Sequence, residues 1–94
     1  MTTTKEDIVQ QVAGMGFTRK KSIELVESLL EIMKASLERG EELLISGFGK
    51  FYVRRKAQRL GRNPKTGAEA VVRERNVVRF RCSPVLRDRM NAVD

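Results

Sequence analysis

The sequence contains no histidine and no tryptophan, and its single cysteine is Cys82. One thiol cannot form a disulfide within the chain, so the cystine-stapled secreted class is excluded and a reducing compartment is expected. Because histidine is the most frequent general base and metal ligand, its absence argues against an enzyme. The acids at Glu24, Glu27 and Glu31 have the spacing of a solvated helix face. We therefore expect no catalytic site, no metal and no cofactor.

Long hydrophobic runs and aromatic rings are also scarce. No apolar stretch has the length of a membrane span or of a signal-peptide core, so we expect a cytoplasmic protein with no membrane partner. The glycine-rich segments lack the Gly-Lys-Ser/Thr ending of a phosphate loop, so no nucleotide or other small-molecule substrate is expected. A chain of 94 residues with one Tyr and four Phe builds a thin core, which a second subunit would complete.

Positive charge is in excess and is concentrated in the second half of the chain. Residues 1–50 hold seven Lys/Arg and eight Asp/Glu, a net of −1, whereas residues 51–94 hold twelve and four, a net of +8. Positively charged side chains that are crowded in a structured segment repel one another, and an anionic partner relieves this repulsion. We expect that partner to be nucleic acid rather than a membrane surface.

The apolar spacing predicts two helices in the first half. The first begins at the capping hydroxyl of Thr4 and runs to about Gly14–Gly16, and the second begins at Thr18 and ends at Gly40. The apolar stripe of the second helix is wider than the first helix can cover. This surplus favours a dimer, and the alternative is a monomeric core in which the helix packs under a sheet.

The second half changes to a period of two, which predicts strands. We expect a strand over 43–46, a turn over 46–49, a longer strand over 50–59, and a return through 70–72 and 77–81. Phe51, Val53 and Arg55 should face one way, and Tyr52, Arg54 and Lys56 the other. Apolar content falls with distance from the helices, so the outer part of the ribbon has no hydrophobic face. Ser83-Pro84 predicts a short final helix. The fold class is α+β: a two-helix hairpin, a three-stranded antiparallel sheet with a long β-ribbon arm, and a short C-terminal helix.

The tip of this ribbon carries the run GRNPKTG, residues 61–67. A ribbon of two strands fits a DNA groove, with Arg and Lys side chains along its walls. Pro64 is rigid, apolar and without an N–H, so at the end of an arm in the minor groove it has the properties of a wedge between base pairs. Composition alone favours the alternative, an ordinary turn.

These residues carry a resemblance to a known family. The stretch GFGKFYVRRKAQRLGRNPKT is similar to the signature of the HU and integration host factor family of bacterial DNA-bending proteins, and the likeness covers essentially the whole chain. The return strand ERNVVRFR is most similar to an alpha-type subunit of integration host factor. One departure is Cys82-Ser83, where relatives often have a Pro-Gly or Ala-Gly pair. The matching signature positions are Gly47, Phe48, Phe51, Lys56, Arg59, Gly61, Asn63, Pro64 and Thr66.

The resemblance implies an intertwined dimer, either a homodimer or a heterodimer with a paralogous subunit. Its two arms would embrace double-stranded DNA through the minor groove and bend it, without enzymatic activity, in the organisation, recombination and transcription of the bacterial nucleoid. Gly47 and Gly49 would form a tight turn at the saddle, the part of the sheet from which the arm extends. Pro64 would intercalate beside Arg62, Asn63 and Lys65. The remaining contacts to phosphates or groove would come from Arg54, Arg55, Lys56, Arg59, Arg73, Arg75 and Arg79.

We expect one DNA-binding domain over 1–94, made of a helical dimerisation body with the first strand (1–46), saddle strands and arm (47–82) and the C-terminal helix (83–94). Within the same class, the alternative is an HU-like protein that compacts DNA without sequence preference. An RNA-binding basic module is a second alternative, but it would expose stacking aromatics beyond Tyr52. A third, a dimerisation scaffold with an incidental basic arm, predicts no salt-sensitive binding.

Overall fold

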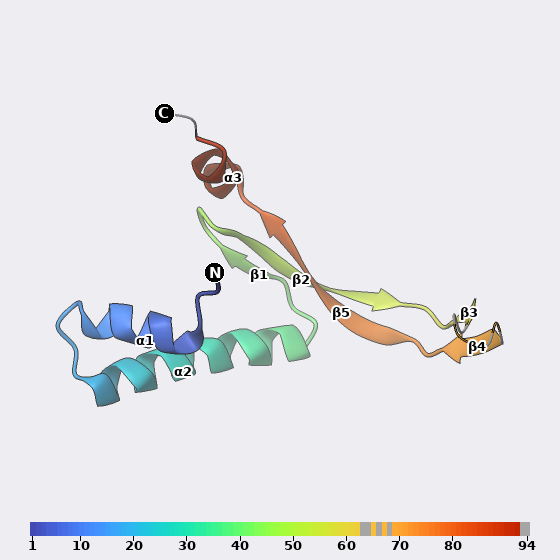
Figure 1. Ribbon diagram of the computed structural model, residues 1–94, viewed down its shortest axis with the longest axis horizontal. Coiled ribbons are helices and arrows are strands. Elements are labelled where there is room, and N and C mark those ends of the chain that lie inside the picture. The colour runs from blue at the N-terminus through green and yellow to red at the C-terminus, as the bar shows by residue number, and fades with distance from the viewer. Residues whose placement is uncertain (63–64, 66, 68, 93–94) are drawn as a thin grey trace. The chain divides into compact units, whose positions relative to one another are not determined.

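The computed structural model describes residues 1–62, 65, 67 and 69–92, with the backbone alone at 62 and 69–72. The chain forms two compact units, Met1–Ser36 and Leu37–Asp94. The first contains α1 (Lys5–Ala13) and most of α2 (Arg19–Glu38); the second contains five strands and α3 (Pro84–Met90) (Figure 1). Within the described part of the chain, no helix has the length and apolar character needed to cross a bilayer.

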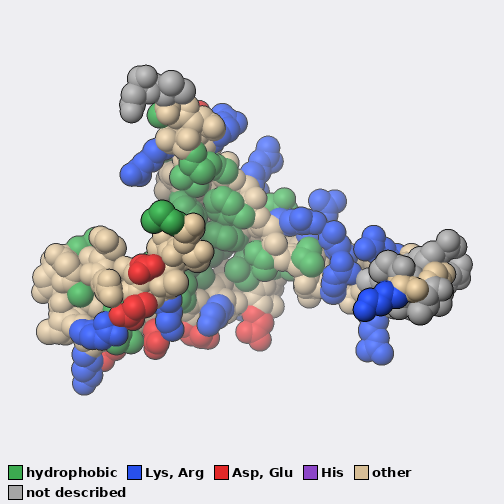
Figure 2. All heavy atoms as spheres, in the orientation of Figure 1, with side chains coloured by type: hydrophobic (Ala, Val, Ile, Leu, Met, Phe, Trp, Pro, Cys, Tyr) green, Lys and Arg blue, Asp and Glu red, His purple; other side chains and the backbone are tan. Residues whose placement is uncertain are grey.

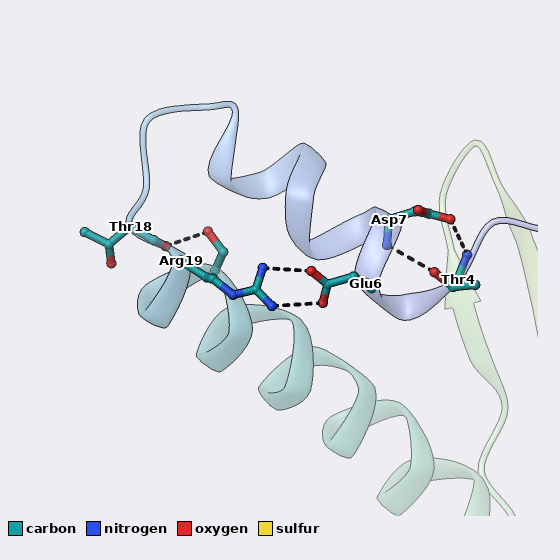
Figure 3. Close-up of polar contacts among 6 residues, drawn as sticks. Thr4, Glu6, Asp7, Thr18 and Arg19 are labelled. Carbon is teal, nitrogen blue, oxygen red and sulfur yellow. Dashed lines mark hydrogen bonds and ion pairs between the residues drawn. The ribbon is translucent and has the colours of Figure 1, made fainter.

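The predicted helix starts are confirmed by their hydrogen bonds. Asp7 donates its backbone N–H to Oγ1 of Thr4 at 3.2 Å, and Thr4 donates its own to Oδ2 of Asp7 at 2.8 Å, which closes a reciprocal capping box (Figure 3). At the second helix, Lys21 donates its backbone N–H to Oγ1 of Thr18 at 3.1 Å. Both hydroxyls thus satisfy N–H groups that would otherwise lack a partner.

The helical hairpin is held by a small apolar contact and by ion pairs at its surface. Val9 of α1 and Val26 of α2 are buried. The guanidinium of Arg19 makes two hydrogen bonds with the carboxylate of Glu6, at 2.7 and 3.2 Å (Figure 3). These bonds hold the pKa of Glu6 below its ordinary value. The pair is exposed to solvent, so it contributes little to the stability of the hairpin.

Much of the apolar surface of this hairpin stays uncovered, as the sequence predicted. Leu25 is 38% exposed and Leu29 is 58% exposed, and both line an open apolar groove of about 260 Å³ together with Ile8 and Val12. Isolated large apolar side chains are common on surfaces, but a continuous groove of them is typical of an interface.

In the second unit, three strands form an antiparallel sheet in the order β1-β2-β5: β1 is Leu43–Ile45, β2 is Gly49–Lys56 and β5 is Arg75–Cys82. The outer arm is a second pair of antiparallel strands, β3 (Arg59–Arg62) with β4 (Glu69–Val72). Lys56 pairs with Arg75 and Arg59 with Val72, so two residues on each strand separate the ladders and the register does not shift.

This interruption corrects the predicted continuous strand over 50–59. The strand ends at Lys56 and pairing resumes at Arg59. By register the unpaired residues face one another as Ala57 with Glu74 and Gln58 with Arg73. Neither pair joins aromatic or β-branched side chains, which support strands across a ladder, so cross-strand side-chain contacts do little to hold the strands together here. We call residues 57–58 and 73–74 the joint of the arm.

The start of the final helix agrees with its prediction. Ser83 is the N-cap of α3 and accepts a hydrogen bond from the backbone N–H of Leu86 at 3.1 Å, and Pro84 follows at the first helical position. Ser83 also donates its backbone N–H to the carbonyl of Phe48 at 2.9 Å. The Cys82-Ser83 pair therefore makes a regular helix start that is tied to the turn between β1 and β2.

The two glycines predicted at the saddle have different environments. Gly47 lies in the turn between β1 and β2 with φ of 77°, the left-handed region that glycine adopts most easily. Gly49 is the buried first residue of β2. A Cβ there would lie 2.5 Å from the carbonyl oxygen of Arg81 and 2.5 Å from the ring of Phe80. Gly49 is thus required for space.

Candidate nucleic-acid interface

Pairing between β2 and β5 separates the side chains of the inner arm onto two faces. Residues that are directly opposite in an antiparallel ladder share a face, and successive residues alternate. One face contains Phe51 opposite Phe80 and Val53 opposite Val78. With Phe48, the two facing rings form a cluster with centroid separations of 4.7 to 6.3 Å. This face is the apolar side of the sheet, and the predicted alternation of β2 is confirmed.

The other face is basic along its whole length. It joins Lys50 with Arg81, Tyr52 with Arg79, Arg54 with Val77 and Lys56 with Arg75. Figure 2 shows Lys and Arg side chains following the arm. We call this surface the cationic face, and it consists of Lys50, Arg54, Lys56, Arg75, Arg79 and Arg81.

The cationic face has an electrostatic signature at Lys56. The pKa of Lys56 lies below its ordinary value, chiefly because of the charge of Arg79, then because of partial desolvation, and then because of the charges of Arg75, Arg59 and Arg54. Four positive charges therefore act on one ammonium group. Such a cluster is unfavourable in the free protein and favourable beside an anion.

Two members of the cationic face were missing from the sequence prediction. Lys50 and Arg81 are paired across the base of the ribbon. Lys50 lies 5.8 Å from the ring centroid of Tyr52 and 3.7 Å from Oε2 of Glu42. Their positions alternate in step with Arg54 and Arg79, so the strand period would have identified both once the register was known.

The structure brings together only some of the predicted contact residues. Arg54, Lys56, Arg75 and Arg79 lie on the cationic face. Arg55 lies on the opposite face, in register with Asn76, and its Nη2 is 2.6 Å from Oε2 of Glu74. Arg73 and Lys65 are exposed, at the joint and near the tip. Of the remaining predicted residues, Arg59 begins β3, Arg62 ends it, and Asn63, Pro64 and Thr66 lie outside the described residues.

Removal of charge at Lys56 should stabilise the fold. Because the native pKa is lowered, the unfolded state binds more protons at alkaline pH, and the free energy of unfolding rises as pH passes through the native pKa. The repulsion acts fully at neutral pH. We expect Lys56→Gln to raise Tm at pH 7, with the advantage shrinking at alkaline pH.

The check is thermal unfolding followed by circular dichroism over a pH series. The matched control is Lys34→Gln on the exposed side of α2, which should not raise Tm. A Tm for Lys56→Gln that falls at pH 7, or a gain that persists unchanged at high pH, would contradict the repulsion argument.

No group of three or more His, Cys, Asp or Glu among the described residues is arranged to hold a metal ion. The charged groups of the cationic face are the guanidinium and ammonium groups of Arg and Lys side chains on a narrow two-stranded ribbon. Guanidinium and ammonium groups on such a surface hydrogen-bond and neutralise phosphates. The fold and this surface define a polyanion-binding protein with a basic β-ribbon arm.

Comparisons with known proteins agree with that class. The family model described as bacterial DNA-binding protein matches residues 3–91, and the chain belongs to this family. It is 47% identical over 92 residues to the integration host factor subunit alpha of Anaeromyxobacter sp. (strain Fw109-5), covering 97% of this chain and 93% of that protein. It is 46% identical over 90 residues to the corresponding subunit of Erythrobacter litoralis (strain HTCC2594), covering 95% and 90%.

A solved structure has the same fold. The Anabaena HU–DNA cocrystal structure superposes with a TM-score of 0.83 at 27% sequence identity, covering 94% of this chain and 97% of that chain. The predicted family and the predicted α+β architecture are both confirmed.

Proposed function

We propose that this protein is a non-enzymatic architectural protein that bends double-stranded DNA with its β-ribbon arm. The observation that carries this proposal is the cationic face, which places six Lys and Arg side chains on one side of a two-stranded ribbon. A ribbon of this kind enters a DNA groove and meets phosphates along both walls. The names of its relatives, which are integration host factor alpha subunits and a DNA-bound HU, support the same function.

The proposed working form is a dimer, formed with an identical chain or with a paralogous subunit. The support is the open apolar groove of the helical hairpin, in which Leu25 and Leu29 remain exposed. In this form residues 1–46 supply the dimerisation body and first strand, 47–82 the saddle and arm, and 83–94 the C-terminal helix. The whole of 1–94 then acts as one DNA-binding domain in the bacterial nucleoid.

At the tip, Pro64 is proposed to intercalate between base pairs, with Arg62, Asn63 and Lys65 beside it in the minor groove. Unstacking one base step costs a few kcal/mol, and contacts of the bent DNA with the charged arm offset this cost. Gly47 and Gly49 shape the saddle from which the arm extends. The proposed phosphate contacts are Arg54, Arg55, Lys56, Arg59, Arg73, Arg75 and Arg79.

Steep salt dependence is the test of this function. If about six phosphates are neutralised per dimer, the logarithm of the binding constant should fall with a slope of about −5 against the logarithm of salt concentration. The measurement is fluorescence anisotropy with a plain duplex, the same duplex with a nick or mismatch, and one duplex enriched by repeated selection for binding. A slope near zero would contradict the proposal.

The same experiment separates two ways of choosing DNA. A strong gain from the nick with little sequence preference would indicate HU-like selection of deformable DNA. High affinity for the enriched duplex in excess random competitor would indicate a site-preferring integration host factor subunit. A preference for folded RNA over every duplex would favour the RNA-binding alternative.

A further inference from the structure

Arg55 differs from the other basic residues of the inner arm. It lies on the face opposite the cationic face, and its Nη2 is 2.6 Å from Oε2 of Glu74. Both side chains are accessible, with exposed fractions of 69% for Arg55 and 55% for Glu74. In the free protein this guanidinium is therefore already engaged by an anion at the surface.

Glu74 occupies a particular place in the arm. It belongs to the joint, opposite Ala57 in the shared register, so Arg55 reaches it diagonally across the ribbon. Around this pair is an open hollow of roughly 230 Å³, lined by Arg55, Glu74, Arg75 and Asn76. By register, Arg55, Glu74 and Asn76 lie on the same face of the ribbon, and among the described lining residues Glu74 is the only acid.

We propose that this hollow is a phosphate-binding site and that the Glu74 carboxylate holds it in the free protein. Guanidinium groups bind carboxylate and phosphate oxygens with the same hydrogen-bonding geometry, so the two anions are exchangeable partners of Arg55. A DNA phosphate that enters the hollow displaces Glu74 and takes its place. This inference rests on the proposed DNA-binding function. It adds to that function one residue, Glu74, that lowers the affinity for DNA.

The exchange has a functional consequence at the joint. Contact with Arg55 is opposed by Glu74 on every duplex, whether straight or bent. Only DNA whose backbone reaches the joint closely enough to replace the ion pair gains this contact. Glu74 therefore disfavours loose, non-specific association, in the way that an unfavourable contact improves selectivity.

The experiment compares full-length wild-type protein with Glu74→Gln, in which the side chain keeps its size and loses its charge. The probe is a plain labelled duplex, followed by fluorescence anisotropy at several salt concentrations. Since exposed ion pairs contribute weakly, we expect binding about two- to fivefold tighter. The salt slope should become steeper by about one, because one more phosphate contact forms without the loss of an ion pair.

A double-mutant cycle distinguishes exchange at Arg55 from a general gain of positive charge. In an Arg55→Gln background, Glu74→Gln should lose most of its gain and match Asp88→Asn, an acid-to-amide control on α3. An equal gain with and without Arg55, or no gain over Asp88→Asn, would overturn the phosphate site. If wild-type protein fails to bind the duplex at low salt, the proposed function itself fails, so the two failures are distinct.

Discussion

Replacement of Gly49 by alanine is expected to destabilise the protein by about 3 kcal/mol, because a Cβ at this position has no room. The added carbon would lie 2.5 Å from the carbonyl oxygen of Arg81, a backbone atom in the paired strand. The ring of Phe80 is equally close and belongs to the aromatic cluster with Phe48 and Phe51. The strands β2 and β5 would have to separate at the base of the arm, and the cationic face would lose its register.

The measurement is thermal unfolding at a fixed protein concentration, since a dimer's Tm depends on concentration. For a chain of this size, a loss of that magnitude lowers Tm by about 12 to 24 °C. Gly47→Ala is the matched control. Its Cβ would meet nothing within 4 Å, but its φ of 77° costs about 1 to 2 kcal/mol for a residue with a side chain. If Gly49→Ala is no worse than Gly47→Ala, the close strand approach is not what Gly49 provides.

Replacement of Pro64 by alanine is expected to reduce DNA bending far more than DNA association. In the proposed function, association depends on phosphate contacts along the arm, which this substitution leaves intact. The proposed bending depends on opening a base step, which costs a few kcal/mol, so loss of the proposed wedge should shift the complex toward straight DNA by about tenfold or more. The signal is energy transfer between dyes at the two ends of a short duplex.

Pro84→Ala provides the control for this experiment, since Pro84 is the other proline of the chain and begins α3. It should leave energy transfer unchanged. A duplex that already contains a nick or mismatch should restore bending by Pro64→Ala, because the base step is then partly open. Unchanged bending of the plain duplex by Pro64→Ala would remove the wedge.

The two faces of the inner ribbon have different roles: one stabilises the fold, and the other is the proposed binding surface. Phe51, Val53, Val78 and Phe80 supply apolar contacts on one face, whereas the cationic face adds repulsion that is strong enough to lower the pKa of Lys56. The repulsion is relieved when phosphates approach, so its loss makes a favourable contribution to the free energy of binding.

The sequence by itself determined the helix starts, the period of the strands and the family, because these depend on local chemistry. Thr4, Thr18 and Ser83 cap helices through hydrogen bonds that span three residues, and a period-two pattern specifies a strand without knowledge of its partner. The signature around the tip is likewise a property of consecutive residues. These features could be predicted from the amino-acid sequence alone.

Only the tertiary structure decided which side chains meet across the ribbon. The register placed Lys50 and Arg81 on the cationic face, turned Arg55 toward Glu74, and left residues 57–58 and 73–74 unpaired. It also showed that Gly49 is required for space, whereas its neighbour Gly47 is required for its backbone angle. Apart from the backbone angle of Gly47, these facts depend on partners about 15 to 32 residues away, and cross-strand geometry is not encoded in the spacing of neighbours along the chain.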